Sequence, residues 1–477
     1  MPRAFCGQAE RRFLQIGELV VHVVILQPLS ANSYVVVGDT FSTLASPDPH
    51  AVVLDLPGTG GSSPWSGKRT YGDYVELAKS TARELALDSW RVLTPAAGDI
   101  SGQLSFFDRF AVASAPRADG AHLASSWDLV RACEIFGSFA HRTGDRRNRE
   151  RALAGAEQLH DRTVALAAAP EVVVAHARAL RGEAVDFSFS KDDLNEGPVR
   201  RSYVQISSGR VHLRTYGARA GNPIEVPLFV LHPSPGSALP YAAVSHAFAQ
   251  RRTVFAPDML GNGDSDGAPM TAQRRTIRDY ANDAAETIRA LTGGPVDVWG
   301  THTGALVAME LAISHPTLVR RLVMDGITLF DQSTTTDFLT NYLPPFLLDA
   351  HGAHLLRAWG MVHDMMLFWP WYRQNPEGAR TNGALPTDVL HERVVDLLRS
   401  GPTFRAAYEA AFSYPAAERL PLLGTPTMLS AHPTDPLRVH LPEAKKIQPG
   451  LELADTFGLG PEISRSVEVY ESWFEQS

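Results

Sequence analysis

A short apolar run that ends in two closely spaced glycines constrains this fold more than any other feature of the sequence. Val296–Trp299 has the length and composition of a buried strand, and GTHTG, residues 300–304, follows directly before a segment rich in Ala and Leu that predicts a helix. Such a strand-to-helix turn strains its central residue, so the residues two before and two after it must be small. Gly300 and Gly304 meet this need. His302 is therefore expected to project above a sheet, beside the N-terminus of a helix.

Two earlier apolar runs also end in loops of distinctive composition. Leu228–Leu231 leads into HPSPG, residues 232–236, and Thr253–Ala256 leads towards DMLGNGDS, residues 258–265. A periodic helical pattern comes next, and two later strands are predicted at Arg321–Met324 and Thr427–Ser430. Alternation of strands with helices predicts an α/β fold with a mostly parallel sheet.

These motifs, taken in order, carry a resemblance to a known family. A strand ending in His-Pro, then D-x-x-G-x-G-x-S, then a strand, G-x-x-x-G and a helix resembles the α/β-hydrolase superfamily over about residues 200–477. The resemblance implies an α/β-hydrolase fold with a helical cap at about residues 331–420.

The resemblance also implies an oxyanion hole at the turn. The backbone N–H of Thr303 would contribute, together with one from the loop that contains Pro233, Ser234 and Gly236. In the family, the position of His232 shapes this loop and does not transfer protons. Asp258 and Ser265 are expected to be structural, Ser265 as the cap of the next helix.

The expected catalytic set departs from the family in two places. His302 stands where the family has serine, and the segment near Leu451–Phe457, after which the family histidine would come, is succeeded by Gly-Leu-Gly-Pro. The family acid would come after the strand Thr427–Ser430, where Asp435 fits, and Asp325 is an alternative. A serine acyl-enzyme mechanism is therefore not expected.

A histidine at the turn has several chemical uses. The partial positive charge of a helix N-terminus favours a neutral imidazole, which is a general base or a hydrogen-bond donor to a carbonyl oxygen. We expect an enzyme, a hydrolase or lyase, that acts on a small, largely apolar or aromatic carbonyl- or ester-type substrate by a non-serine mechanism through His302. Two alternatives stay open: a non-catalytic pseudo-hydrolase that serves as a ligand-binding or scaffold protein, and a serine-type esterase with a relocated nucleophile such as Ser234.

The predicted cap is rich in aromatic residues and methionine. Most of them are expected to form the core between cap helices, and a few are expected to meet an apolar substrate. Arg357 and Arg373 are in range of a substrate carboxylate, but solvent exposure is expected for both.

The first part of the chain repeats the second in the same order. RRFLQIGELVVHV, residues 11–23, matches RRSYVQISSGRVHL, residues 200–213, and AVVLDLPGTGGS, residues 51–62, matches TVFAPDMLGNGDS, residues 253–265. The tetrapeptide GAHL recurs at residues 120 and 352. The sequence therefore predicts duplication.

The two copies are predicted to be unequal. Residues 1–187 are interpreted as a truncated, degenerate copy, residues 188–199 as a linker, and residues 200–477 as the complete domain. In the first copy Ala96 takes the position of His302, and Val24–Gln27 matches the strand before His232, with Gln27 in place of that histidine.

Composition excludes several classes of function. The net charge of −8 gives no basic surplus for nucleic acid or an anionic membrane, and no apolar run reaches the length of a membrane span. Two cysteines make a disulfide framework improbable, which favours the reducing cytoplasm. No cofactor is expected, and no metal, because no histidine pair shows an H-x-x-x-H or H-E-x-x-H spacing with suitable company. The expected partner is a small-molecule substrate, and a homo-oligomer is left open.

Overall fold

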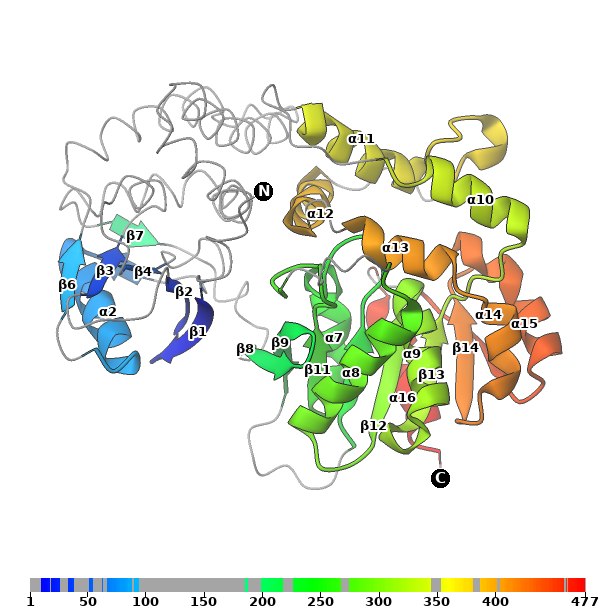
Figure 1. The fold of residues 1–477 in the computed structure, drawn as a ribbon, viewed down its shortest axis with the longest axis horizontal. Coiled ribbons are helices and arrows are strands. Elements are labelled where there is room, and N and C mark those ends of the chain that lie inside the picture. The colour runs from blue at the N-terminus through cyan, green and yellow to red at the C-terminus, as the bar shows by residue number, and fades with distance from the viewer. Residues whose placement is uncertain are drawn as a thin grey trace. The chain divides into compact units, whose positions relative to one another are not determined.

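The computed structural model describes residues 10–17, 19–25, 33–37, 51–54, 62, 67–87, 90–93, 185–187, 199–217, 226–266, 274–344, 353–380, 387–400, 404–458, 460 and 462–476. The chain forms two compact units (Figure 1). One consists of residues 1–195 with 348–356, and the other of residues 196–347 with 357–477.

The second unit is built on an eight-stranded sheet with the order β15-β14-β13-β12-β10-β11-β9-β8. Strand β9 pairs antiparallel with β8 and β11, and the pairs from β11 to β15 are parallel. The strands are β8 Arg200–Ile206, β9 Gly209–Tyr216, β10 Leu228–Leu231, β11 Val254–Pro257, β12 Val296–Thr301, β13 Val319–Asp325, β14 Thr427–Ala431 and β15 Glu452–Asp455.

Helices cover both faces of this sheet, which explains the continuous apolar runs of its central strands. In β12, Val298 packs towards α8 and α9, whereas Trp299 packs towards α7 and α16 on the opposite face. Successive side chains of a strand point to opposite faces, so both faces need apolar residues. The helices are α7 Ala242–Ala249, α8 Ile277–Leu291, α9 Thr303–Ser314, α15 Leu441–Ile447 and α16 Ile463–Phe474.

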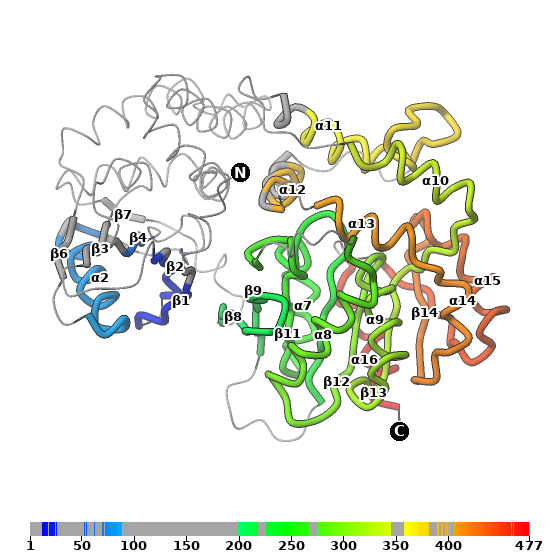
Figure 2. The backbone as a smooth tube through the Cα atoms, in the orientation of Figure 1, coloured from blue at the N-terminus to red at the C-terminus, as the bar shows by residue number. Residues whose placement is uncertain are grey.

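The predicted helical insertion lies between β13 and β14. In Figures 1 and 2, α10, α12 and α13 lie beyond the carboxyl ends of the parallel strands. The helices are α10 Gln332–Asn341, α11 Ala353–Leu367, α12 Thr387–Ser400, α13 Phe404–Phe412 and α14 Ala416–Arg419. Short 3-10 turns are η2 Leu239–Tyr241, η3 Pro316–Leu318, η4 Pro376–Gly378, η6 Leu420–Leu422 and η7 Pro436–His440.

The first unit contains a five-stranded sheet with the order β1-β2-β4-β3-β6. Strand β2 is antiparallel to β1 and β4, and β3 is parallel to β4 and β6. The strands are β1 Glu10–Ile16, β2 Leu19–Ile25, β3 Ser33–Val37, β4 Ala51–Leu54 and β6 Trp90–Leu93. Helix α2 is Tyr71–Glu84, and β5 Gly67–Arg69 pairs with β7 Val185–Phe187. The order and directions of the five strands equal those of β8-β9-β11-β10-β12.

The predicted match of Val24–Gln27 with the strand before His232 is wrong. Val24 and Ile25 continue β2, the hairpin partner of β1, so they do not start a new strand. Strand β3 occupies the place between β4 and β6 that β10 occupies between β11 and β12. Gln27, Ala96, the GAHL segment at residue 120 and most of the predicted linker lie outside the described residues.

One hydrogen bond recurs at matching places in the two sheets. The backbone N–H of His22 in β2 donates to Ser62 Oγ at 2.9 Å, and that of His212 in β9 donates to Ser265 Oγ at 2.8 Å. Ser265 is therefore a strand-to-loop contact and not the predicted helix cap, because α8 begins after Thr276. Both serines are buried.

A helix start also recurs. The carboxylate of Asp73 accepts the backbone N–H of Thr70 at 2.6 Å, and that of Asp279 accepts the N–H of Thr276 at 2.7 Å. In both cases the Thr hydroxyl donates to the same carboxylate oxygen. These contacts satisfy N–H groups that a helix start leaves without partners.

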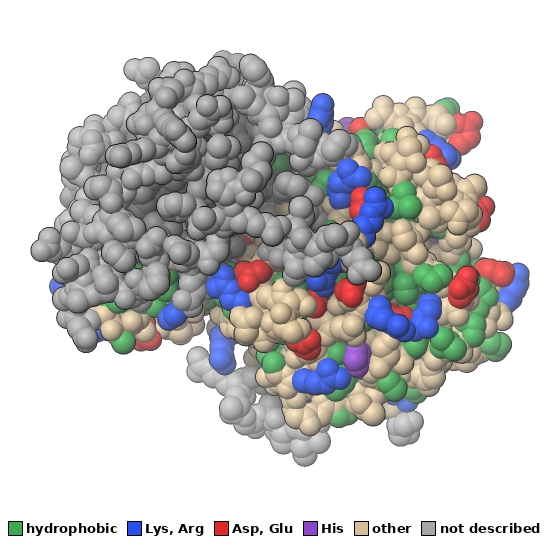
Figure 3. Space-filling view, viewed as in Figure 1, with side chains coloured by type: hydrophobic (Ala, Val, Ile, Leu, Met, Phe, Trp, Pro, Cys, Tyr) green, Lys and Arg blue, Asp and Glu red, His purple; other side chains and the backbone are tan. Residues whose placement is uncertain are grey.

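The described surface has no marked separation of charge in the view of Figure 3, where basic and acidic side chains are interspersed over the second unit. Among the described helices, none combines the length and apolar character that crossing a membrane requires.

Candidate functional site

The turn between β12 and α9 has the strained backbone that the sequence predicts. His302 has φ 49° and ψ −110°, and its N–H donates to the carbonyl oxygen of Asp325 at 3.0 Å. A β-carbon at Gly304 would lie 2.1 Å from the carbonyl oxygen of Leu231, and one at Gly300 would lie 2.5 Å from that of Gly304. Close approach of the strand, turn and helix therefore requires glycine at both positions.

His302 forms a hydrogen bond with Asp435, from the loop after β14. His302 Nε2 and Asp435 Oδ2 are 2.7 Å apart, and the His302 side chain stays 38% exposed. Burial and the helix N-terminus disfavour the imidazolium, but the carboxylates of Asp435 and Asp325 outweigh them, so the pKa of His302 is raised. Burial alone would raise the pKa of Asp435, but the charge and hydrogen bond of His302 outweigh this effect, so the pKa is lowered. The ionised carboxylate accepts Nε2–H, which leaves the lone pair on Nδ1.

Asp325, the alternative acid, does not contact the imidazole by a hydrogen bond. Its side chain is 8% exposed, and Ser430 Oγ donates to its Oδ1 at 3.0 Å. Burial raises the pKa of Asp325 to about 6, against the opposing effects of His302 and Ser430. Of the two predicted acids, Asp435 is therefore the hydrogen-bonded partner, and Asp325 acts on His302 through its charge and its backbone carbonyl.

His232 holds the loop after β10. Its Nδ1 donates to the carbonyl oxygen of Pro233 at 2.7 Å, and its Nε2 accepts the N–H of Met259 at 2.9 Å. The ring is fully buried, and burial lowers its pKa. With both nitrogens engaged, the neutral ring connects two loops, as the resemblance implied.

Three backbone donors in the segments predicted to form an oxyanion hole have no acceptor among the described residues. They are the N–H groups of Thr303, Ser234 and Gly236. Ser234 Oγ is buried and likewise has no partner in the described part of the chain. Because no base contacts this hydroxyl, the geometry gives no activation of Ser234 as a nucleophile.

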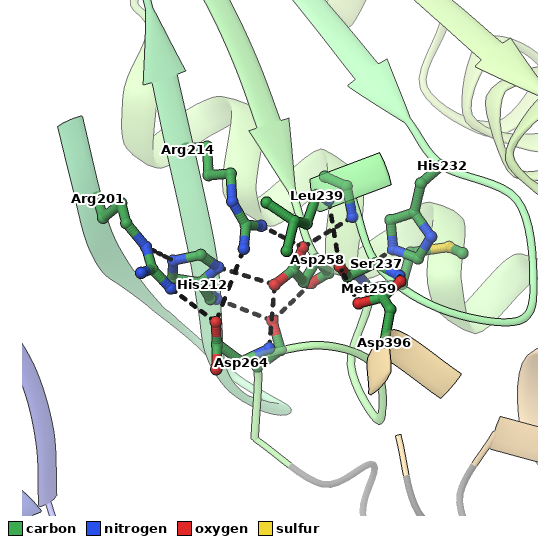
Figure 4. Close-up of polar contacts among 12 residues, drawn as sticks. Arg201, His212, Arg214, His232, Ser237, Leu239, Asp258, Met259, Asp264 and Asp396 are labelled. Carbon is green, nitrogen blue, oxygen red and sulfur yellow. Dashed lines mark hydrogen bonds and ion pairs between the residues drawn. The ribbon is translucent and has the colours of Figure 1, made fainter. Parts of the chain in front are cut away.

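The cap and the sheet fix this loop from two sides (Figure 4). Asp396 of α12 accepts the N–H and the hydroxyl of Ser237, each at 2.6 Å, and Asp258 accepts the N–H of Ala238 at 2.9 Å. Gly236 has φ +107°, and a β-carbon there would lie 2.3 Å from Asp396 Oδ2. Sequence reasoning missed Asp396, since nothing in its local pattern distinguishes it from other helical acids.

Asp258 belongs to a buried network of ionic groups (Figure 4). Its carboxylate contacts Arg214 Nη1 and His212 Nδ1, each at 2.8 Å, and Arg201 contacts Asp264 at 2.7 Å. Burial raises the pKa of Asp258, but Arg214 and His212 outweigh it and the pKa is strongly lowered. Burial and Arg214 lower the pKa of His212 to about 4.

His212, Asp258 and Asp264 lie close enough together to hold a metal ion. Two arginines already contact this group, however, and they supply the positive charge that an ion would bring. The arrangement fits an ion-pair scaffold under the loop, the structural role expected for Asp258.

An aromatic cluster fills the cap. Tyr342 has the rings of Phe338, Trp369, Tyr408 and Phe412 within 5.8 Å, centroid to centroid. Four of these five rings are buried and Trp369 is half-buried, as expected for side chains in the core between cap helices. As expected, Arg357 and Arg373 are exposed, and Arg373 pairs with Asp337.

Comparison with known proteins agrees with this geometry. The family model described as alpha/beta hydrolase fold matches residues 226–390. The chain is 35% identical over 103 residues to the 2-hydroxymuconate semialdehyde hydrolase of Pseudomonas sp. (strain CF600), covering 21% of this chain and 36% of that protein. It is 36% identical over 131 residues to the soluble epoxide hydrolase of Corynebacterium sp. (strain C12), covering 27% and 42%. The matches thus span less than half of each relative.

A solved structure with a similar fold is epoxide hydrolase A from Mycobacterium thermoresistibile, with a TM-score of 0.45 and 19% identity over 57% of this chain and 96% of that one. The family match covers β10 to β13 and part of the cap, the elements that form the His302 turn. The mixed eight-stranded sheet, the cap inserted after β13 and this match identify an α/β-hydrolase fold in this chain.

Proposed function

We propose that this chain is a hydrolase of small, largely apolar or aromatic carbonyl or ester compounds, with His302 as the general base. The observation that carries the proposal is the contact of 2.7 Å between His302 Nε2 and Asp435, on a ring whose Nδ1 has no partner in the described residues and whose surface remains accessible. A histidine oriented by a carboxylate is the arrangement that general-base catalysis needs.

In the proposed reaction, water is the nucleophile. His302 Nδ1 takes a proton from water while the water oxygen bonds to the substrate carbonyl carbon, and Asp435 stabilises the resulting imidazolium. The N–H groups of Thr303, Ser234 and Gly236 would donate hydrogen bonds to the carbonyl oxygen and stabilise the negative charge that develops on it. The bond to the leaving group then breaks, and the imidazolium returns its proton to that group. Acid and alcohol leave, and the base is regenerated.

The cap supports an apolar or aromatic substrate. Phe338, Tyr342 and Tyr408 belong to an aromatic cluster in helices that lie beyond the carboxyl ends of the strands, the edge on which His302 stands. Relatives named as a 2-hydroxymuconate semialdehyde hydrolase and an epoxide hydrolase also support a small-molecule substrate.

The test is His302→Ala, assayed on a series of 4-nitrophenyl and phenyl esters. We expect a loss of roughly 10²–10⁴-fold in kcat/KM with unchanged melting temperature, since the change removes proton transfer. His363→Ala is the matched control: His363 contacts Asp364 at 2.9 Å and is 39% exposed, but it lies in α11. Unchanged turnover by His302→Ala would refute the proposal.

The pH dependence gives a second measure. The base must be neutral, and its pKa is raised, so kcat/KM should rise with pH and level off above an apparent pKa higher than 6.5. A fluorophosphonate probe should not label the protein. Labelling that disappears in Ser234→Ala would instead support a serine-type esterase, and ligand binding with no turnover would support a pseudo-hydrolase.

We further infer that residues 10–93 are a truncated copy of the domain that begins at residue 200, without catalytic function. The common strand order, the His–Ser hydrogen bond and the Thr–Asp helix start support this inference. Ala96, in the position of His302, has no group for proton transfer.

A further inference from the structure

Arg380, in the segment after η4, is a half-buried cation in the cap. Its backbone N–H donates to the carbonyl oxygen of Leu367 at 2.7 Å, and its Nη1 donates to that of Met365 at 2.8 Å. Both carbonyls belong to the last turn of α11, where helices leave such groups without partners. The guanidinium is therefore held in place by the end of a helix.

The remaining edge of this guanidinium has no partner in the described part of the chain. Nε is buried without a hydrogen-bond acceptor, and no described carboxylate forms an ion pair with Arg380. Two other buried or half-buried arginines of the second unit have carboxylate partners: Arg252 pairs with Asp297 and Glu471, and Arg419 pairs with Glu310. A cation removed from water normally has a partner, so this edge is the exception to explain.

Arg380 is also close to the candidate site. Burial lowers the pKa of Arg380, and the charge of Asp435 and the phenol of Tyr342 act against this effect. Burial lowers the pKa of His302 and Asp435 raises it. The positive charge of Arg380 is a smaller effect that also lowers it. The guanidinium is thus close enough for electrostatic interaction with His302, Asp435 and Tyr342.

We propose that the free Nε–Nη2 edge of Arg380 binds a carboxylate of the substrate. The proposal rests on the guanidinium held by the end of α11, on its buried Nε, which has no acceptor among the described residues, and on its origin in the cap. Two parallel N–H groups match the two oxygens of a carboxylate. The substrate class, which rests on the proposed function, is then a small apolar or aromatic carbonyl compound with a carboxylate at the end remote from the reacting bond.

The first experiment measures binding, not turnover. Phenylacetate and its neutral isostere phenylacetamide are titrated into the full-length protein by calorimetry. Wild type should bind phenylacetate and bind phenylacetamide at least tenfold more weakly. Arg380→Gln should lose roughly tenfold or more in affinity for phenylacetate, and Arg380→Lys should lose part of it, because an ammonium has charge but no planar fork. Arg373→Gln, an exposed arginine that pairs with Asp337, should behave as wild type.

Several outcomes would overturn the assignment. They are equal binding of acid and amide, unchanged affinity in Arg380→Gln, or no binding of phenylacetate by wild type. Equal binding of inorganic phosphate and phenylacetate would show a general anion site and contradict carboxylate recognition.

Kinetics separates this proposal from the proposed function. Mono-4-nitrophenyl glutarate is compared with 4-nitrophenyl butyrate, and Arg380→Gln should raise KM for the first ester alone. His302→Ala should bind phenylacetate normally while losing turnover. If turnover survives in His302→Ala but phenylacetate binding still depends on Arg380, the catalytic proposal fails and the carboxylate site stands. If His302→Ala loses turnover but phenylacetate binding does not depend on Arg380, the carboxylate site fails and the catalytic proposal stands.

Discussion

The five-stranded sheet of the first unit and the first five strands of the second have the same order and directions, yet the two sheets differ in extent. The first sheet ends at β6 in the part of the chain that the structure describes, whereas the second continues through β13, β14 and β15. Strand β13 ends in Asp325, and the loop after β14 supplies Asp435; these are the two carboxylates that act on His302.

The difference teaches that the sheet and the site are separable. The elements common to both units are those that stabilise the sheet. They are a hairpin, a serine whose hydroxyl accepts a backbone N–H of β2 or β9, and a helix with a capped N-terminus. The acids come from the strands added in the second unit. A sheet of these five strands can thus form without the strands that carry Asp325 and Asp435.

The largest effect that tests this separation is expected from Asp435→Asn. The amide keeps the shape of the side chain and can still accept the N–H of Leu437, but it no longer stabilises the imidazolium. We expect a loss of roughly 10²-fold or more in kcat/KM. Since the carboxylate is what raises the pKa of His302, the rising limb of the pH–rate profile should move to lower pH. An unchanged pH–rate profile would mean that Asp435, in the loop after β14, does not set the pKa of His302.

The next effect concerns the cap, which is also inserted after β13. Asp396→Asn keeps one of the two acceptor oxygens of the side chain, whereas Ser237 still offers two donors, its N–H and its hydroxyl. We expect kcat to fall roughly tenfold while phenylacetate binding through Arg380 is retained, because the loop that carries the N–H groups of Ser234 and Gly236 loses part of its support. Asp337→Asn, at a half-buried carboxylate of α10 that pairs with Arg373, is the control. Equal losses in kcat and in binding would indicate a general loosening of the cap instead.

The smallest effects come from the matched serines. Ser62→Ala and Ser265→Ala each leave a buried strand N–H without its acceptor, at a cost of about 1–2 kcal/mol. Amide hydrogen exchange should show faster exchange at His22 in the first variant and at His212 in the second. Ser265→Ala should also reduce turnover slightly, because Ser265 Oγ donates to the carbonyl oxygen of Asp258. A comparable loss of turnover in Ser62→Ala would contradict the view that the sheet of the first unit is independent of the catalytic site.

Much of the second unit could be predicted from local patterns. Leu228–Leu231 is a strand with the predicted bounds, and the glycines around His302 indicated the strained turn. The match of Val24–Gln27 failed because an apolar run does not reveal where one strand ends and the next begins. Strand β3 at Ser33–Val37 was identified only by its neighbours in the sheet.

Contacts between distant residues were beyond the sequence. Ser237 and Asp396 are 159 residues apart, and His302 and Asp435 are 133 apart. No sequence pattern distinguishes Arg380, because what sets it apart is a buried Nε without a partner among the described residues.

The sequence by itself determined the fold class, the strained turn and the histidine upon it, because these depend on local apolar runs and on the space that glycine leaves. Only the tertiary structure decided that Asp435 and not Asp325 contacts the imidazole, that the pKa of His302 is raised, and that Arg380 Nε is buried without a partner among the described residues. Hydrogen bonds and pKa values depend on distances of a few ångströms and on burial. Those are set when strands far apart in the chain pair side by side, and no local pattern contains them.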